Sequence, residues 1–467
     1  MKRTRRAATR QAGSADTAIA RRVETLIGTV TLAGALEGLV LAGRAGLDPT
    51  LFLEIARVSS GGSAMLERYG PRVLARRFAA ADRPLARLER DLAATLALGR
   101  RCGMPTPLAA VAHGWLLAVL RHDAGADDPA ALLTVYERLA GWSLAAAQPR
   151  AAPGRRSPAA REGIVRVGFV GLGRIGRPIA ACIRRAGFPM IVHNRSQGAV
   201  GDMVREGAER AASPAETAAR ADVVLTCLPD NEAVERVYLG PSGLVEGARP
   251  EQVLVDVGTT ALGLTRRLDA AAAARAAIFV DAPVTGGIPA ALEGRLTLMV
   301  GASEEGFRRA SPVLAAMAER LFHVGPPGAG QSTKLVGNML LGTNTAALAE
   351  GLALGVAAGL AADELLERLL RSSADSWVMR LRGPKMVQRD FRPLFTVLGR
   401  LKDSQAALAL GRELHVPLPP AAVAHELYQA AAARGCGAED FATVVRVYEG
   451  LAGLTVGPAT DHDQAPR

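Results

Sequence analysis

The chain has 467 residues, of which 49% are hydrophobic, so several domains with sizeable cores are expected. Its net charge of +11 would suit a nucleic-acid-binding protein, but residues 1–10 contribute +5 of it and residues 147–163 contribute +3. Neither stretch has an aromatic-rich basic stripe, which favours a solvated tail and linker over a nucleic-acid site. The four cysteines are scattered, so we expect no metal site or disulfide, and a reducing cytoplasm fits.

The N-terminal part of the chain is expected to be helical after a short tail. Residues 1–19 are basic and contain no apolar core, so we expect a disordered tail and no signal peptide. Residues 20–146 are rich in Ala, Leu and Arg, and their apolar residues recur at spacings of three and four, which predicts helices throughout. Residues 23–47 are apolar enough to suggest a membrane helix. Three charged residues interrupt them and favour a buried helix instead: Glu24, Glu37 and Arg44.

The middle of the chain has a different pattern. Residues 147–163 have the composition of a linker. Residues 164–325 alternate short apolar runs with helical patterns, which predicts a doubly wound parallel sheet with room for an odd edge strand. The expected strands are Val165–Val170, Met190–His193, Val223–Leu228, Val253–Val257, Ile278–Val280, Leu296–Val300 and Leu321–Val324. Residues 326–455 return to a purely helical pattern, and residues 456–467 form a polar tail.

The two helical regions repeat one another. Glu37-Gly-Leu matches Glu350-Gly-Leu at an offset of 313, and Val135–Gly141 matches Val447–Gly453 at an offset of 312. Further matches keep the same register: Ser59-Ser60 with Ser372-Ser373, Gly70-Pro71 with Gly383-Pro384, Ala97–Arg100 with Ala409–Arg412, and Ala109–His113 with Ala421–His425. A single-residue gap accounts for all of them. We therefore predict a duplicated helical domain with a nucleotide-binding domain between the copies.

A glycine turn follows the first expected strand. Its sequence is Gly171-Leu172-Gly173-Arg174-Ile175-Gly176, and a helical pattern follows. Strand, glycine turn and helix in this order are what the dinucleotide fingerprint requires. Gly171 permits the tight turn, Gly173 lets a pyrophosphate approach the backbone, and Gly176 lets helix and strand pack closely. We expect this turn to bind a dinucleotide at the positive end of the helix, in a Rossmann-type α/β domain.

The end of the second strand indicates which dinucleotide is bound. An acidic side chain at this point would hold the ribose of NAD. This chain has Asn194-Arg195-Ser196 instead. Arg195 can neutralise a 2′-phosphate and Ser196 can donate a hydrogen bond to it, which favours NADP(H) over NAD. The alternative is a solvated arginine at a strand end.

Three later strands end in polar or turn residues, at Cys227–Asp230, Asp256–Thr259 and Asp281–Gly287. Ligands of such sheets bind beyond the carboxyl ends of the strands. Within the last of these stretches, Thr285, Gly286 and Gly287 can present a hydroxyl and N–H groups to a small anion. The alternative is that all three stretches are simple turns.

The second helical region opens with a lysine and an asparagine. Lys334 and Asn338 are four residues apart, so they share a helix face near its start. The positive end of the helix lowers the pKa of an ammonium group, and a lysine in a partly dry site can then act as a general acid/base. The alternative is one solvent-facing lysine. Further on, Phe395 and Lys402-Asp403 lie in another expected helix. On their own they predict no site, because a Lys-Asp pair on a helix usually faces solvent.

Together these motifs resemble the β-hydroxyacid dehydrogenases in their order and rough spacing. That family includes 3-hydroxyisobutyrate dehydrogenase, tartronate semialdehyde reductase and glyoxylate/succinic semialdehyde reductase, and the resemblance covers residues 164–455. It implies that Lys334 is the catalytic acid/base with Asn338 beside it. The other residues that it implies are Thr285, Gly286, Gly287, Phe395 and Asp403 for the substrate, and Leu228, Pro229, Thr259 and Lys402 for the cofactor. The family's usual serine is Thr285 here.

The resemblance implies an NADP-dependent dehydrogenase of small β-hydroxy acids, or a reductase of the matching semialdehydes, with no nucleic-acid or membrane partner. Imine reductases share the fold but usually lack a lysine at position 334, and a non-catalytic NADP-binding scaffold is the other alternative. In the N-terminal copy Arg21 and Thr25 stand at the positions of Lys334 and Asn338. Because arginine does not release a proton near neutral pH, we expect this copy not to catalyse. We expect it to pack on the other helical copy as an intrachain pseudo-dimer. The sequence does not decide whether whole chains also form a homo-oligomer.

Overall fold

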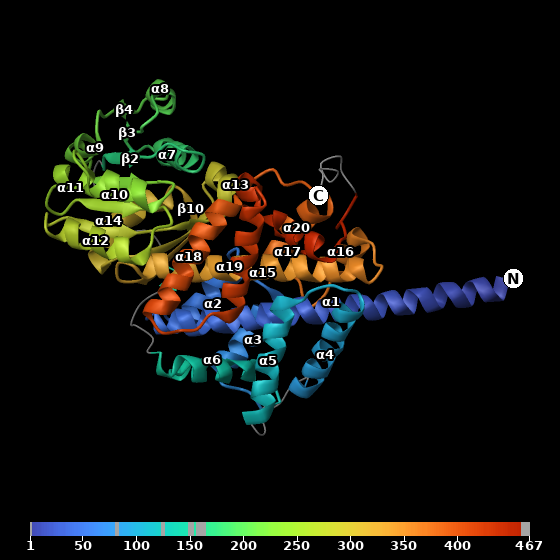
Figure 1. Ribbon diagram of the computed structural model, residues 1–467. Coiled ribbons are helices and arrows are strands. Elements are labelled where there is room, and N and C mark those ends of the chain that lie inside the picture. The colour runs from blue at the N-terminus through green and yellow to red at the C-terminus, as the bar shows by residue number, and fades with distance from the viewer. Residues whose placement is uncertain (1, 80–83, 123–126, 148–153, 156–164, 459–467) are drawn as a thin grey trace. The chain divides into compact units, whose positions relative to one another are not determined.

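The computed structural model describes residues 2–79, 84–122, 127–147, 154–155 and 165–458, with side chains from residue 15 onward except at 154–155 (Figure 1). Two compact units make up the chain. Unit 1 comprises Met1–Arg44, Ala56–Ala146 and Val336–Arg467, and unit 2 comprises Ala45–Ile55 and Ala147–Leu335. The predicted domain boundaries stay a prediction, and the terminal part of the predicted polar tail, from residue 459, lies outside the described residues.

Unit 2 contains a mainly parallel sheet. Its described strands are β1 Gly154–Arg155, β2 Val167–Val170, β3 Met190–His193, β4 Glu209–Arg210, β5 Val223–Thr226, β6 Val253–Asp256, β7 Ile278–Asp281, β8 Val284–Thr285, β9 Leu296–Gly301 and β10 Ala318–Gly325. They lie in the order β1-β10-β9-β7-β6-β5-β2-β3-β4, with β8 paired to β9. All seven expected strands are confirmed. The antiparallel edge strand β1 lies in the predicted linker, whose other residues from 148 onward fall outside the described part.

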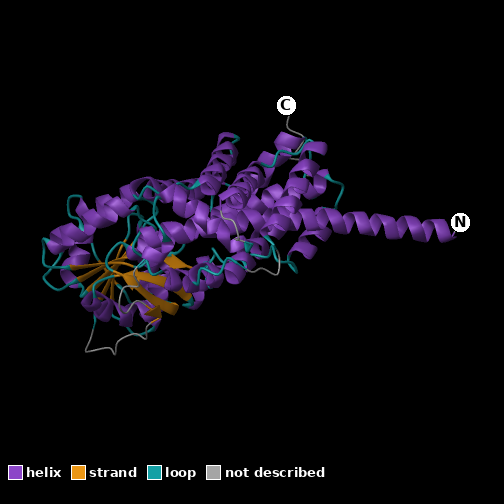
Figure 2. Ribbon diagram, turned by 90° about the horizontal axis from the view of Figure 1, so that it is seen from below, coloured by secondary structure: helices purple, strands orange, loops and turns teal. Residues whose placement is uncertain are grey.

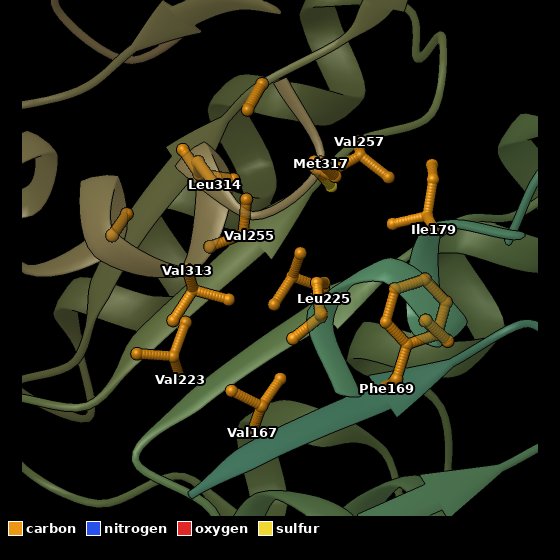
Figure 3. Close-up of a cluster of buried hydrophobic side chains, with 14 of the residues drawn as sticks. Val167, Phe169, Ile179, Val223, Leu225, Val255, Val257, Val313, Leu314 and Met317 are labelled. Atoms are coloured by element: carbon orange, nitrogen blue, oxygen red, sulfur yellow. The ribbon is translucent and has the colours of Figure 1, made fainter. Parts of the chain in front are cut away.

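Both faces of this sheet are buried, as parallel sheets require. Val223 and Leu225 of β5 belong to a core cluster on one face, which Figure 3 shows together with Phe169 of β2. Val224, the residue between them, belongs to the cluster on the other face. The helices that cover the sheet are α7 Gly176–Arg185, α8 Gln197–Arg205, α9 Pro214–Arg220, α10 Asn231–Leu239, α11 Leu244–Gly247, α12 Leu262–Ala273, α13 Gly287–Glu293 and α14 Glu304–Ala315.

One helix from the N-terminal region also packs on the sheet. Helix α2 (Pro49–Arg57) places Leu51 and Ile55 in a buried cluster with residues of β9 and β10. The partners in that cluster are Met299, Phe322 and Val324. The sequence analysis assigned α2 to the N-terminal helical copy, and it did not anticipate this contact.

Unit 1 is helical in its described residues (Figure 2). The order of its elements repeats. The first run is α1 Lys2–Arg44, α3 Ala64–Leu74, α4 Leu85–Arg101, α5 Pro107–His122, η1 Pro129–Leu132, α6 Leu133–Ala140 and η2 Leu144–Ala146. The second run is α15 Ala329–Ala357, α16 Ala362–Leu369, α17 Trp377–Val387, α18 Val397–Glu413, α19 Pro419–Ala433, η3 Cys436–Ala438, η4 Phe441–Val444 and α20 Val445–Ala452. The first turns of α15 belong to unit 2.

The start of α1 corrects one expectation. Residues 2–19 are helical, where we predicted a disordered tail. Alanine and arginine are both strong helix formers, so the composition that suggested a tail is equally able to extend the helix that follows.

Among the residues that the structure describes, two helices are long and apolar enough to cross a membrane by length and composition alone. They are Ala15–Arg44 and Ala329–Ala357, and 100% and 94% of their most apolar windows are buried inside the protein. Such burial is the pattern of core helices, in agreement with the interpretation that we preferred for residues 23–47.

The two helical runs contact each other through matched pairs of residues. A Cβ on Gly38 would lie 2.8 Å from Leu340 Cδ2, and a Cβ on Gly351 would lie 2.6 Å from Ile27 Cδ1. The second pair is the first one transferred by the offset of 313. Glycine at both positions therefore allows α1 and α15 to approach closely, since any side chain there would collide.

Two buried glutamates make a second set of matched contacts between the runs. Glu37 Oε1 accepts a hydrogen bond from Ala421 N in the first turn of α19, at 3.1 Å. Glu350 Oε1 accepts one from Ala109 N in the first turn of α5, at 2.9 Å. Glu350 Oε2 also accepts from Tyr448 Oη at 2.9 Å. Each glutamate thus satisfies free N–H groups at a helix start of the other run.

Candidate active site

The glycine turn after β2 leaves open space beside a helix N-terminus. Gly171 has a φ of +101°, and a Cβ there would lie 2.4 Å from the carbonyl oxygen of Cys227. A Cβ on Gly176 would lie 2.0 Å from the carbonyl oxygen of Gly171. Gly173 is exposed, and a Cβ there would meet no atom within 4 Å. Packing therefore requires the first and third glycines, while the second leaves the open approach that a pyrophosphate needs.

Side chains at the end of β3 support this turn. Asn194 Oδ1 accepts a hydrogen bond from Leu172 N at 3.0 Å, and its Nδ2 donates to Ser196 Oγ at 2.9 Å. Arg195 is exposed and makes no hydrogen bond or ion pair with any residue that the structure describes. Its guanidinium is therefore available to a ligand beside the turn, whereas Asn194 holds the turn itself.

Four more of the residues predicted for the cofactor lie in this turn or in the segment beside it. Leu228 Cδ2 would lie 3.1 Å from a Cβ on Gly171, so this side chain packs against the turn. Pro229 next to it is exposed. Within the turn, Arg174 is exposed and Ile175 is half-buried.

Asp256, the last residue of β6, holds the loop that carries Thr259. Its carboxylate accepts hydrogen bonds from Gly258 N at 3.0 Å and from Thr260 Oγ1 at 2.6 Å. Gln331 fixes the loop from the other side: its Oε1 accepts from Thr260 N at 3.0 Å, and its Nε2 donates to Gly258 O at 2.9 Å. Sequence reasoning missed Gln331, although it lies inside the motif Gly-Ala-Gly-Gln-Ser-Thr-Lys.

Asp281, the last residue of β7, fixes the start of α15. Its Oδ1 accepts from Gly328 N and its Oδ2 from Gln331 N, both at 2.6 Å. Burial raises the pKa of Asp281 to about 7, and the two N–H groups oppose that rise. Because the first turn of α15 is tied to the end of a strand, the position of Lys334 one turn later is determined by the sheet.

The turn after β8 has the backbone that its two glycines predict. Gly286 and Gly287 have φ values of +124° and +70°, in the region that favours glycine. Thr285, in β8, is buried, and α13 begins at Gly287. The role of this turn in binding a carboxylate stays a prediction.

Two separately predicted motifs meet in unit 1. Asn338 of α15 is 5% exposed, and its Nδ2 donates to Asp403 Oδ2 at 2.7 Å. Asp403 lies in α18, and Lys402 Nζ is 3.6 Å from its Oδ1. Lys334, one turn before Asn338 on α15, is half-buried. An asparagine whose amide nitrogen is held by a buried carboxylate has its orientation fixed, which is what a residue that positions a substrate needs.

Phe395 lies two residues before the start of α18. Its backbone N–H donates to Asp440 Oδ2 at 3.2 Å, and its ring packs edge-on against Phe441 with centroids 6.2 Å apart. Its side chain remains 37% exposed. Phe441 thus contacts the ring, while part of the residue stays exposed.

The equivalent positions in the N-terminal run are built differently. Thr25 Oγ1 donates to the carbonyl oxygen of Arg21 at 2.9 Å, within its own helix. The Asp91 side chain, at the position of Asp403, is 41% exposed. The cavity at this place, lined in part by Thr25, Tyr69 and Leu88, has a volume of about 20 Å³, room for about one water molecule.

A larger cavity, of about 410 Å³, lies in unit 2, where β5 and β6 begin. Its arginines are engaged in ion pairs, for example Arg249 with Asp222 and Arg309 with Glu251. It lies at the amino ends of the strands, whereas ligands of such sheets bind at the carboxyl ends. We therefore do not assign it to the reaction.

Two family models match the chain. The NAD binding domain of 6-phosphogluconate dehydrogenase matches residues 166–325. The model described as NAD-binding of NADP-dependent 3-hydroxyisobutyrate dehydrogenase matches twice, over residues 18–136 and 328–448. The chain belongs to the β-hydroxyacid dehydrogenase family. The predicted fold class, a Rossmann-type α/β domain flanked by two homologous all-α domains, is confirmed.

Individual relatives agree with this assignment. The 2-(hydroxymethyl)glutarate dehydrogenase of Eubacterium barkeri is 36% identical over 60% of this chain and 94% of its own length. A solved 3-hydroxyisobutyrate dehydrogenase of Mycobacterium tuberculosis with L-serine is 30% identical, with a TM-score of 0.57 over 61% of this chain and 98% of its own. Psf3, solved with NADP+ and 2-OPP, is 27% identical, with a TM-score of 0.54 over 60% of this chain and 99% of its own.

As a β-hydroxyacid dehydrogenase, the protein is an NAD(P)-dependent oxidoreductase that acts on CH–OH groups. The expectation of an enzyme is confirmed, and so is the expectation of a nicotinamide dinucleotide cofactor. The glycine turn fits this cofactor, because Gly173 offers the open approach and α7 begins at Gly176, with the positive end of its dipole at the turn.

Proposed function

We propose that this enzyme transfers a hydride between NADP(H) and a small β-hydroxy acid or its semialdehyde, with Lys334 as the general acid/base. The observation that carries the proposal is the pair on α15: Lys334 half-buried, and Asn338 one turn later held by the buried Asp403 at 2.7 Å. The names of the relatives, which describe small hydroxy acids, support the substrate class.

The proposed roles follow from the chemistry of each group. A nicotinamide dinucleotide held at the turn of Gly171–Gly176 would accept the hydride in oxidation and supply it in reduction. Lys334 donates a proton to the carbonyl oxygen during reduction and removes it from the hydroxyl during oxidation. The substrate carboxylate is oriented by Asn338, by Thr285 and by the N–H groups of Gly286 and Gly287. A substrate bound in this way has its reacting carbon in the correct position.

The experiment that tests this proposal is turnover of NADPH with a panel of small semialdehydes and of NADP+ with the matching hydroxy acids. A member of the panel should give saturable turnover, with a preference for the phosphorylated cofactor. Absence of turnover with every hydroxy acid and semialdehyde would contradict the proposal. Reduction of cyclic imines in place of semialdehydes would favour an imine reductase.

We also propose that the N-terminal run takes, within one chain, the place of a partner subunit's helical domain. The matched contacts support this idea, because a twofold relation predicts reciprocal pairs. Ala64 N donates to Asp375 O at 2.9 Å, and Trp377 N donates to Gly62 O at 3.0 Å. Adding 313 to 62 and 64 gives 375 and 377, so each of these two hydrogen bonds is the equivalent of the other.

We place the enzyme in the cytoplasm, in keeping with its four free cysteines.

The intrachain pairing is also supported by helices α2 and α16, which are equivalent in the two runs but differ in burial and charge. Leu51 and Ile55 of α2 are buried against the sheet of unit 2. The equivalent residues of α16 are Glu364 and Arg368, which are exposed. A chain with one nucleotide-binding domain needs only one such apolar face, and charged residues on the other keep it in water.

A further inference from the structure

The core of the second helical run contains an arginine for which the fold alone gives no reason. Arg400, in α18, is 0% exposed. None of its three guanidinium nitrogens has a hydrogen-bond partner among the described residues. A buried cation without such partners is costly, and apolar residues of similar volume usually serve stability as well or better.

The N-terminal run shows that the fold accepts an apolar residue at this place. At the offset of 312, the residue equivalent to Arg400 is Leu88, which is buried. Gly342 of α15, whose Cβ would lie 3.5 Å from Arg400 Nε, becomes Thr29 there. The space that the guanidinium needs is therefore present only in the second run.

The cation, a buried carboxylate and an amide occur together in one run and are lost together in the other. In the second run, Asp403 follows Arg400 by three residues on α18, is 2% exposed and holds Asn338. Its Oδ1 receives no hydrogen bond from the described residues. In the first run, Leu88 accompanies a half-exposed Asp91 and a threonine that bonds to its own helix.

Two other ionisable groups near Arg400 already have partners. Arg382 of α17 has its Nε 3.2 Å from Asp440 Oδ1 and its guanidinium over the ring of Phe441. On α19, Tyr428 Oη donates to Gly342 O at 2.9 Å. Burial lowers the pKa of Arg400, and Asp403 and then Tyr428 oppose that change. Asp403 lies three residues further along α18 and carries a carboxylate. It is therefore the group that the charge of Arg400 can stabilise.

We propose that Arg400 is a positioning residue: its buried positive charge attracts the Asp403 carboxylate and holds it in place, and Asp403 in turn holds Asn338 in the orientation that the substrate requires. Lys402 cannot fill this role in the same way, because its side chain is 30% exposed and its charge is screened by water. The inference rests on the proposed role of Asn338 in substrate binding.

The test compares Arg400→Leu, Arg400→Lys and Asp403→Asn in the full chain, with Asp91→Asn as the matched control in the first run. Arg400→Leu should fold, since leucine occupies the equivalent place, and should lower kcat about 10- to 100-fold through misplacement of the substrate, with an unchanged Kd for NADPH. Arg400→Lys should recover most of that loss, and Asp91→Asn should change nothing. The double variant Arg400→Leu/Asp403→Asn should be no slower than the worse single variant, because both act through one chain of contacts.

A second readout does not depend on turnover. The chain has four asparagines, so the side-chain amide of Asn338 can be followed by selective ¹⁵N labelling. Its amide protons should exchange slowly in the wild type and in Arg400→Lys, and fast in Arg400→Leu and Asp403→Asn. If Arg400→Leu leaves this exchange slow and kcat within about twofold, or if the losses of the two single variants multiply, the inference is overturned. If instead the wild type turns over no hydroxy acid, the proposed function fails, while the exchange measurement still decides the role of Arg400.

Discussion

Single residues distinguish the two helical runs mainly where a reaction would need them. Lys334, Asn338 and Arg400 become Arg21, Thr25 and Leu88 in the first run. Groups with a structural role keep their identity in both. Glu37 with Glu350 and Ser63 with Ser376 make contacts between the runs, and the ion pair Arg76–Glu137 with Arg389–Glu449 stabilises each run from within. The first run therefore has the residues of a packing surface without those of a catalyst.

The choice of cofactor is expected to depend on Arg195. A charge-assisted hydrogen bond contributes about 1.5–3 kcal/mol, so Arg195→Ala should weaken NADPH binding roughly tenfold or more and leave NADH binding unchanged. Titration of both cofactors into both proteins measures this. Arg174→Ala, a second exposed arginine in the glycine turn, is the control for a general loss of positive charge. An equal loss for NADPH and NADH would show that Arg195 does not read the 2′-phosphate.

Glu350 should make stability depend on pH. Burial raises its pKa from 4.5 to about 7, so the folded protein keeps a proton that the unfolded chain releases above about pH 4.5. Stability from this group is therefore greatest below pH 4.5 and is lost as the pH rises to about 7, by about 3 kcal/mol. Urea unfolding at pH 5 and pH 7.5 should show a smaller difference in Glu350→Gln than in the wild type. Asp281, whose pKa is also raised to about 7, adds a slope of the same sign in both proteins. Equal slopes would refute the assignment.

At the scale of elements, equivalent helices have different surroundings. Helix α2 is apolar where it meets β9 and β10, and α16 is charged on the corresponding face. The strand pattern is equally dependent on surroundings: β5 alternates between two cores because both of its faces are covered, while the two-residue strand β4 has both residues exposed.

The contact of α2 with the sheet can be tested by exchanging its residues with those of α16. Leu51→Glu/Ile55→Arg buries two charges against Phe322 and should lower the stability of the protein by several kcal/mol, seen as a clear fall of Tm. The reverse exchange, Glu364→Leu/Arg368→Ile, changes exposed positions and should stay within about 0.5 kcal/mol of the wild type. Similar Tm values for both variants would mean that α2 does not depend on the sheet.

At the scale of the whole molecule, removal of the first run should leave the second run with an uncovered apolar surface. The surface includes Leu340 and Gly351, which contact Gly38 and Ile27. Deletion of residues 1–146 should therefore give an insoluble protein, or one that dimerises through the remaining helices. Sedimentation at several concentrations distinguishes these outcomes. A truncated chain that stays monomeric with an unchanged Tm would remove the basis for an intrachain partner.

The sequence predicted the elements better than their contacts. The seven apolar runs were recognisable because strands buried on both faces contain little else. The glycine turn was recognisable because Gly171 and Gly176 admit no other side chain. Contacts that depend on tertiary structure left no pattern in the local sequence. Glu37 accepts a hydrogen bond from the first turn of α19, and Gln331 accepts one from the loop of Thr260. Arg400 is buried in a helix whose sequence looks like that of an ordinary charged surface.

The most direct test of this account is the turnover of NADPH by two matched variants on the best semialdehyde of the panel. Lys334→Ala should lower kcat by about 10²–10⁴-fold, the usual effect of a lost general acid/base, with little change in the Kd for NADPH. Arg21→Ala, at the equivalent place in the first run, should keep the rate of the wild type. If Lys334→Ala keeps most of its activity, or if Arg21→Ala loses as much, then the assignment of catalysis to the second run alone is wrong.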